Sequence, residues 1–145
     1  MCVLHIDFET DNLDLILSST NIPVYQVYKK GDNYKHRKDK TYDRNLISCV
    51  VSDKEWDDVE GQTDDIIIFI EKHQNDLEFI KENVDNVDWK FDLPYHCRLS
   101  DTLFNQNNFL SPQVLLLCGK LGIGLNLSLY HPPCDEQENE NIKTE

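Results

Sequence analysis

The sequence predicts an α+β fold, in which an open β-sheet carries helices on one of its faces, as in a ferredoxin-like domain or a related sandwich. Three observations predict it. Several segments alternate between apolar and polar residues, which is typical of strands with only one buried face. Helical segments separate these strands, and 145 residues amount to one domain. We expect a single α+β domain over residues 1–131 and a disordered acidic tail over residues 132–145.

The chain opens with a strand and a short helix. Residues 4–8 alternate, with Leu4, Ile6 and Phe8 on one face. Thr10 or Asp11 can cap the helix, which ends before Pro23. Its apolar face is expected to carry Leu13, Ile16 and Leu17.

Two further strands and two polar connections follow. Residues 24–28 predict a brief strand, and a polar, basic loop begins at Gly31. Residues 46–51 predict a second clear strand, and residues 52–61 an acidic connection. The more buried face of that strand carries Ile47, Cys49 and Val51.

The longest helix is expected after this connection, with Thr63, Asp64 and Asp65 as its cap and first turn. Its apolar stripe comprises Ile66, Ile70, His73, Leu77, Ile80 and Val84. Residues 87–93 then predict a third clear strand that runs past Pro94 toward Arg98, and a loop rich in Asn and Gln covers residues 100–108.

The best-defined signals lie at the end of the domain. Ser111 can cap a helix, Pro112 suits its first position, and Gly122 suits the left-handed residue after its last turn. Residues 123–130 alternate and predict the last strand. We expect Ile123, Leu125, Leu127 and Leu129 to turn together into the interior.

Composition limits the cellular setting and the chemistry. No apolar run approaches the ~20 residues needed to span a bilayer, and the N-terminus does not resemble an export signal. Five scattered cysteines then predict reduced thiols in the cytoplasm, with Cys49 and Cys118 acting as small apolar residues. Neither a cofactor nor a membrane partner is expected.

Charge separation along the chain points to protein binding. The formal net charge is −13, and an acidic run surrounds Trp56. Tryptophan is enriched among interface hot spots, and surrounding charge speeds the capture of an oppositely charged partner. The alternative is that Trp56 packs back on the helices while the carboxylates face water. The predicted partner-binding residues are Asp53, Glu55, Trp56, Asp57, Asp58 and Glu60.

The segment from Lys29 to Arg44 supports a different function. It holds seven basic and three acidic residues, a charge of +4 that leaves −17 on the rest of the chain. Cations interleaved with tyrosines can hold a small anion or a single-stranded nucleic acid. The alternative anion-binding residues are Lys35, His36, Arg37 and Lys38, although the acidic remainder disfavours nucleic acid.

Other constellations carry weaker signals. Gly119, Gly122 and Gly124 lie where a helix leads into a strand, the reverse of a phosphate-binding loop. Zinc would need the pairs His96/Cys97 and His131/Cys134 to meet, so no metal site is predicted. His73 lies on the apolar stripe of the long helix, as core histidines do. No hydrolase, metalloprotease or nucleotide motif is present, which favours a non-enzyme.

A family resemblance is carried mainly by residues 110–113, which read Leu-Ser-Pro-Gln, and by Leu121-Gly122-Ile123 before a strand ending at Tyr130. With the short helix ending at Pro23 and Lys30-Gly31-Asp32, these segments resemble the bacterial domain-of-unknown-function family DUF4279 over roughly residues 3–130. The resemblance implies a small α+β domain of the immunity-protein type, which neutralises a toxin. It implies no catalytic residues.

Overall fold

The computed structural model describes residues 1–9, 11, 13–35 and 37–131. The sequence expectations for Thr10, His36, Cys134 and the tail over residues 132–145 fall outside this part of the chain.

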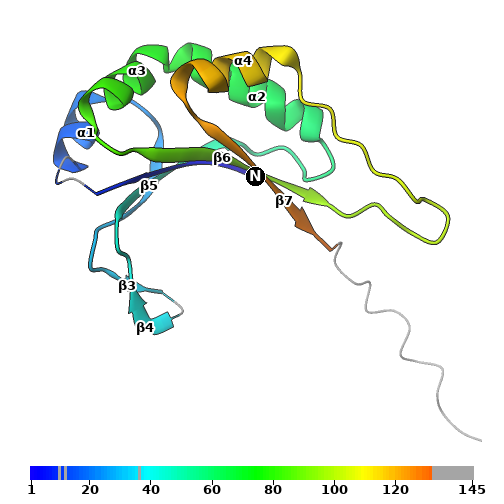
Figure 1. Ribbon diagram of the computed structural model, residues 1–145, viewed down its shortest axis with the longest axis horizontal. Coiled ribbons are helices and arrows are strands. Elements are labelled where there is room, and N and C mark those ends of the chain that lie inside the picture. The colour runs from blue at the N-terminus through cyan, green and yellow to red at the C-terminus, as the bar shows by residue number, and fades with distance from the viewer. Residues whose placement is uncertain (10, 12, 36, 132–145) are drawn as a thin grey trace, which may run out of the picture.

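A five-stranded sheet forms the body of the domain, in the order β2-β5-β1-β6-β7 (Figure 1). Its strands are β1 (Cys2–Phe8), β2 (Val24–Tyr28), β5 (Asn45–Ser52), β6 (Asp88–His96) and β7 (Gly124–Tyr130). All neighbouring strands are antiparallel except β6 and β7, which are parallel. A parallel pair requires a crossover, and the helix between these two strands supplies it.

Four helices pack against the sheet and cover one of its faces (Figure 1). They are α1 (Leu13–Ser19), α2 (Val59–Lys72), α3 (Gln74–Asn83) and α4 (Pro112–Leu121). The predicted α+β class with one covered face is confirmed. The element order is longer than the β-α-β-β-α-β of a ferredoxin-like domain, so the fold is of the related sandwich type.

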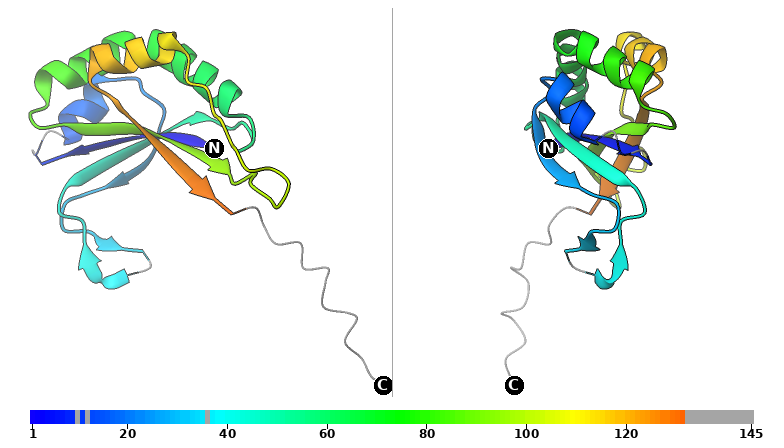
Figure 2. Two further views of the ribbon diagram at one scale, coloured as in Figure 1. Left: turned by 45° about the vertical axis from the view of Figure 1, so that its right-hand side comes forward. Right: turned by 90° about the vertical axis from the view of Figure 1, so that its left-hand side faces the viewer.

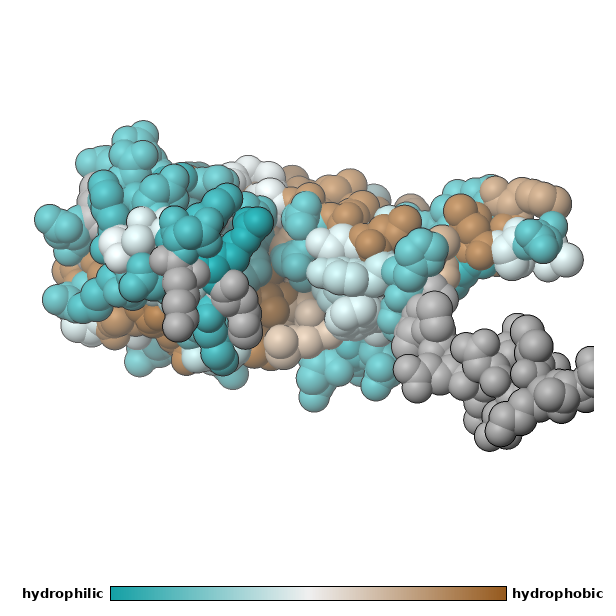
Figure 3. Space-filling model, turned by 90° about the horizontal axis from the view of Figure 1, so that it is seen from below, coloured by the Kyte–Doolittle hydropathy of each residue, from teal (hydrophilic) through white to brown (hydrophobic). Residues whose placement is uncertain are grey.

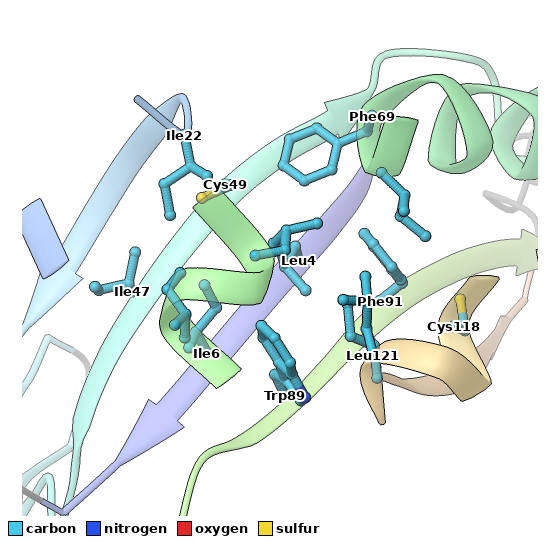
Figure 4. Close-up of a cluster of buried hydrophobic side chains, with 14 of the residues drawn as sticks. Leu4, Ile6, Ile22, Ile47, Cys49, Phe69, Trp89, Phe91, Cys118 and Leu121 are labelled. Carbon is cyan, nitrogen blue, oxygen red and sulfur yellow. The ribbon is translucent and has the colours of Figure 1, made fainter. Parts of the chain in front are cut away.

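The core lies between the sheet and the helix layer (Figure 4). Strand periodicity places alternate residues of each strand on the covered face, as predicted for β1, β5 and β6. The Trp89 indole N–H donates to the Gly122 carbonyl oxygen at 3.0 Å, so this aromatic ring is buried without an unpaired donor. The strand residues that contribute most are Leu4, Ile6, Phe8, Ile47, Cys49, Trp89, Phe91 and Leu93.

The basic loop after Gly31 contains a second, two-stranded sheet that the sequence reading missed. Its strands are β3 (Asn33–Tyr34) and β4 (Arg37–Thr41), which project from the uncovered side of the main sheet (Figure 1). Tyr42 stacks between Tyr28 and Tyr34, with ring centroids 4.3 and 4.1 Å away. This apolar stack gives a short polar hairpin a fixed support.

The single long helix expected from residue 63 onward was wrong, because α2 begins at Val59 and breaks at His73. Asp58 caps α2, since its carboxylate accepts the Gly61 backbone N–H at 2.8 Å. A Cβ on Gly61 would collide with that carboxylate, so glycine permits the cap. His73 adopts a non-helical conformation between α2 and α3, and its Nδ1 lies 3.3 Å from an Asp76 carboxylate oxygen.

The expectation that four apolar residues of the last strand turn together into the interior was wrong for two of them. Ile123 is buried and Leu125 half-buried, but Leu127 and Leu129 are 43% and 54% exposed. All three leucines lie on the covered side of the sheet, but β7 extends out from under α4 (Figure 1). As a border strand it also has a neighbour on one side only. Leu17 of α1 is exposed as well.

Two glycines of the α4 region are expected to respond oppositely to substitution by alanine. Gly122 has φ of +75° after the last helical turn, so Gly122→Ala should lower the free energy of unfolding by about 1 kcal/mol. Gly119 lies within α4 and a Cβ there meets open space, so Gly119→Ala should raise it by about 0.5–1 kcal/mol. Urea unfolding of both variants checks the signs, and equal signs would contradict the observed helix end.

Candidate functional site at the ends of three strands

Strands β5, β6 and β7 run in the same direction, so their C-terminal ends lie at the same end of the sheet (Figure 2). Trp56 follows β5, His96 ends β6 and Tyr130 ends β7. β6 and β7 pair in register up to their last residues, so His96 and Tyr130 are direct partners across the pair. Strand direction therefore brings together three aromatic side chains that are far apart in sequence.

Trp56 packs between the other two rings. Its ring centroid lies 4.7 Å from that of Tyr130 and 5.0 Å from that of His96, and the indole plane is tilted relative to both. Trp56 is half-buried. It is thus neither a free surface anchor nor packed against the helix layer, the two arrangements expected from sequence. Its support is the end of the β6–β7 pair.

The predicted carboxylates are all exposed around this aromatic cluster, namely Asp53, Glu55, Asp57, Asp58 and Glu60. Two of them have structural contacts. Asp58 caps α2, and an Asp57 carboxylate oxygen lies 3.4 Å from Nδ1 of His96. Farther along α2, Asp65 accepts the Ser52 hydroxyl at 2.6 Å and lies apart from the cluster.

Gln62 holds the segment around Trp56 in place. It is fully buried on α2, and its side-chain N–H groups donate to the Pro94 carbonyl at 3.0 Å and the Glu55 carbonyl at 3.3 Å. One side chain therefore joins α2, β6 and the segment that carries Trp56. Its Oε1 has no hydrogen-bond partner among the described residues.

The loop over residues 97–111 combines hydrogen bonds among its polar groups with several exposed apolar side chains. Its polar groups bond to one another and to the strand end: the Arg98 guanidinium donates to the Asn108 side chain at 2.9 Å, and Gln106 donates to the His96 carbonyl at 2.9 Å. Gln106 in turn accepts the Arg98 backbone N–H at 2.8 Å. The exposed side chains of the loop include four apolar ones, Leu99, Leu103, Phe104 and Phe109, beside polar ones such as Arg98 and Asn107.

These apolar residues were missed from sequence. Phe104 and Phe109 are 87% and 76% exposed. The signal in the sequence was the presence of two phenylalanines in a stretch rich in Asn and Gln. That stretch has no helical or strand periodicity, so the pattern does not assign either phenylalanine to a buried face. Figure 3 shows hydrophobic residues gathered at this end of the molecule and hydrophilic residues over the β3–β4 hairpin at the other.

Two hollows flank the loop. One of about 340 Å³ lies between Asp57, Asp58 and Glu60 on one side and Arg98 and Phe109 on the other. The second, of about 320 Å³, is lined mainly by Tyr95, Leu99, Phe104 and Leu129. We call the surface formed by Trp56, Asp57, Asp58, Glu60, Leu99, Phe104 and Phe109 the loop-end surface. It offers one acidic and one apolar hollow side by side.

The alternative anion-binding residues lie elsewhere, on the β3–β4 hairpin. Lys35 and Arg37 are exposed there. The tyrosine rings that were to supply stacking platforms are stacked on one another, so Tyr42 has both of its faces covered. Arg44 contacts the main body instead, where its guanidinium donates to the carbonyl oxygens of Asp7 and Asn86.

A histidine–serine pair lies outside the loop-end surface. On the uncovered face His5 Nδ1 lies 3.0 Å from the Ser48 hydroxyl, but Ser48 is buried, which removes it as a nucleophile for a substrate. Burial also lowers the pKa of His5, against the opposing charge of Asp92. Within the described residues no three His, Cys, Asp or Glu side chains gather as metal ligands.

The cysteines behave as the composition predicted where they are described. Cys49 and Cys118 are buried, and burial raises the pKa of the Cys49 thiol to about 12 and that of Cys118 to about 11. Thiols with such pKa values are protonated and unreactive at neutral pH. They contribute to packing.

Comparison with known proteins adds no family. No family model, curated protein or solved structure matches the chain. Among its described helices, none has the length and apolar character required to cross a membrane.

Proposed function

We propose that this chain is a protein-binding domain and that the loop-end surface contacts a basic protein. The observation that carries the proposal is the loop over residues 97–111, whose polar groups bond to one another and to the end of β6 while two phenylalanines and two leucines are exposed. A loop held rigid by internal hydrogen bonds loses little entropy when its apolar side chains enter a partner. Exposed apolar side chains rimmed by charge are typical of interaction sites.

Charge favours a basic partner. The loop-end surface places Asp57, Asp58 and Glu60 at the rim of one hollow, and the whole chain has a net charge of −13. Such a field accelerates the approach of a cationic protein and repels nucleic acid. A partner that inserts an apolar side chain beside Phe104 and a Lys or Arg beside Asp57 would match both hollows.

The finer form of the proposal is a cytoplasmic bacterial immunity protein that neutralises a cationic toxin. It rests on the acidic surface together with the family resemblance of the sequence. Its test is co-expression with a basic toxin whose gene is sought beside that of this chain: the wild-type chain should restore growth, and the absence of any such toxin gene would contradict this form of the proposal. Restoration by a variant that lacks the two exposed phenylalanines would contradict the assignment of the surface.

Removal of both exposed phenylalanines should abolish most of the binding. For the strongest partner captured from the native host and then purified, Phe104→Ala with Phe109→Ala should weaken Kd by about 1,000-fold, since two hot spots of about 2 kcal/mol each contribute about 4 kcal/mol together. Both side chains are exposed, so the fold should persist, as circular dichroism would verify. Titration calorimetry measures Kd.

The matched control changes two exposed apolar residues on the helix layer, Ile68→Ala with Leu116→Ala, and should leave Kd unchanged. Asp57→Lys should mainly slow association and reduce its salt dependence. Equal loss of affinity in the control and the phenylalanine variant, or capture only of acidic proteins, would overturn the proposal.

A further inference from the structure

We propose that β7 pairs edge to edge with β7 of a second copy of this chain and so extends the sheet across a two-fold axis. This inference goes beyond the proposed function: it concerns the outer edge of β7, although Leu129 of that strand also lines a hollow beside the loop-end surface. The side chains of β7 indicate that the strand pairing with this edge is a second β7.

β7 is an edge strand of the sheet. It lies last in the strand order, and within the described ranges no strand bonds to its outer side (Figure 2). A border strand presents a row of backbone N–H and C=O groups that another strand can pair with. Leu127 and Leu129 are exposed beside this row, which adds apolar area to the backbone groups.

The β7 edge lacks the features that protect edge strands from pairing with a strand of another chain. Its seven residues include no charged residue and no proline, and its pairing with β6 has no bulge. The opposite border, β2, starts directly after Pro23 and has a register irregularity between Val24 and Gln26. Bulges and prolines are common protections of an edge, so β7 is the unprotected one.

The order of residues in β7 is self-complementary. When two copies run antiparallel with Leu127 facing Leu127, Leu125 meets Leu129 and Asn126 meets Ser128 on the opposite face. At the ends Gly124 meets Tyr130, and an aromatic side chain opposite a glycine is a favoured cross-strand pair. Each apolar residue thus meets an apolar one and each small polar residue a polar one.

The two ends of β7 differ in the charged residues that lie nearby, Lys90 at one end and Asp57 at the other. Gly124 lies beside Lys90, whose Cβ is 3.6 Å from where a Cβ on Gly124 would sit. Tyr130 at the other end packs on Trp56, and Asp57 contacts the neighbouring His96. Antiparallel pairing places Lys90 of one copy, which Asp88 and Asp92 flank on β6, toward the end of the other copy that carries Tyr130 and Asp57. An extended peptide of unrelated sequence would lack this match.

Analytical ultracentrifugation of the full chain tests the inference. From about 2 µM to about 500 µM, a range that covers the weak association expected for a small interface, the mass should rise from that of one chain to that of two. Hydrogen exchange at the two concentrations should show added protection in residues 124–130. A single-chain mass at the highest concentration would overturn the proposal.

The central residue provides a sharper test. Leu127→Lys should weaken self-association by about tenfold or more, because two like charges then lie opposite each other. Leu127→Glu should do the same, and a mixture of the two variants should associate again. Ile68→Lys, at a similarly exposed position on α2, should change nothing.

The outcomes separate the alternatives. Failure of the mixed variants to associate would exclude a pair centred on Leu127. Association that survives Leu127→Lys but not Phe104→Ala would place the contact on the loop-end surface instead. Protection of β7 only when an extended partner peptide is added would assign the border to that peptide and overturn self-pairing.

Discussion

Phe91→Ala is expected to lower the free energy of unfolding by about 3–5 kcal/mol, the range for removing a buried phenylalanine side chain. Phe91 lies on β6, between β1 and β7, and is fully buried. Its ring meets that of Phe69 edge to face, with centroids 6.2 Å apart, so it joins the sheet to α2. A loss of this size is a third or more of the stability of many domains.

Phe104→Ala is the matched control for this change, because it removes the same side chain from a position that is 87% exposed. Its effect on unfolding should stay within about 0.5 kcal/mol. Urea unfolding followed by circular dichroism compares the two. If Phe91→Ala does not fold, Phe91→Leu should still cost about 1 kcal/mol. A cost for Phe91→Ala no larger than that for Phe104→Ala would contradict the observed core.

Local signals were sufficient for most of the fold. The helix from Ser111 to Gly122 was predicted with its cap and its end, because the hydroxyl of Ser111 and the positive φ of Gly122 act within one turn. The alternating strands were also predicted, since period two is visible in sequence. Predictions that depend on residues close together in the chain were therefore reliable.

Predictions failed where a distant contact decides the structure. The break at His73 is invisible in the apolar stripe, because the residues on both sides of it still face the core. The alternation of β7 was read correctly, but whether Leu127 is covered depends on how far α4 extends over the strand. Periodicity gives the direction of a side chain and says nothing about what covers it.

The candidate site was likewise predicted in part: features visible in composition were predicted, and those set by strand order were not. The acidic run around Trp56 was visible as composition. That Trp56 rests on His96 and Tyr130 follows from strand order, which the sequence did not reveal. The exposed phenylalanines of the loop were missed because apolar residues are expected inside, and the hydrogen bonds of Arg98 and Gln106 within the loop join residues eight to ten positions apart.

Gln62→Glu is expected to destabilise the domain by about 3–5 kcal/mol at pH 7, because it places an unpaired charge in the interior. Gln62 is fully buried and donates to two carbonyl oxygens, at Pro94 and Glu55. A carboxylate has no hydrogen to donate and would face both oxygens with like partial charge. The change should also loosen the segment that carries Trp56, and with it the binding of a partner.

The pH dependence of the free energy of unfolding of Gln62→Glu distinguishes a buried charge from a simple loss of packing. Burial would raise the pKa of the new carboxyl above its unfolded value of about 4.3, so the folded state binds the extra proton more tightly. The penalty should therefore be smallest below about pH 4 and grow as the pH rises through the folded pKa. The neutral acid can also donate one of the two lost hydrogen bonds.

Gln62→Leu, which keeps a similar volume without a charge, should cost about 1–3 kcal/mol at every pH, because the Pro94 carbonyl loses its side-chain donor and the Glu55 carbonyl keeps only the Asp58 N–H. The measurement is the free energy of unfolding of both variants relative to wild type between pH 4 and 8. A Gln62→Glu penalty that does not change with pH would show that residue 62 reaches water. In that case the bond to Pro94 would not be what holds Trp56 against the end of the sheet.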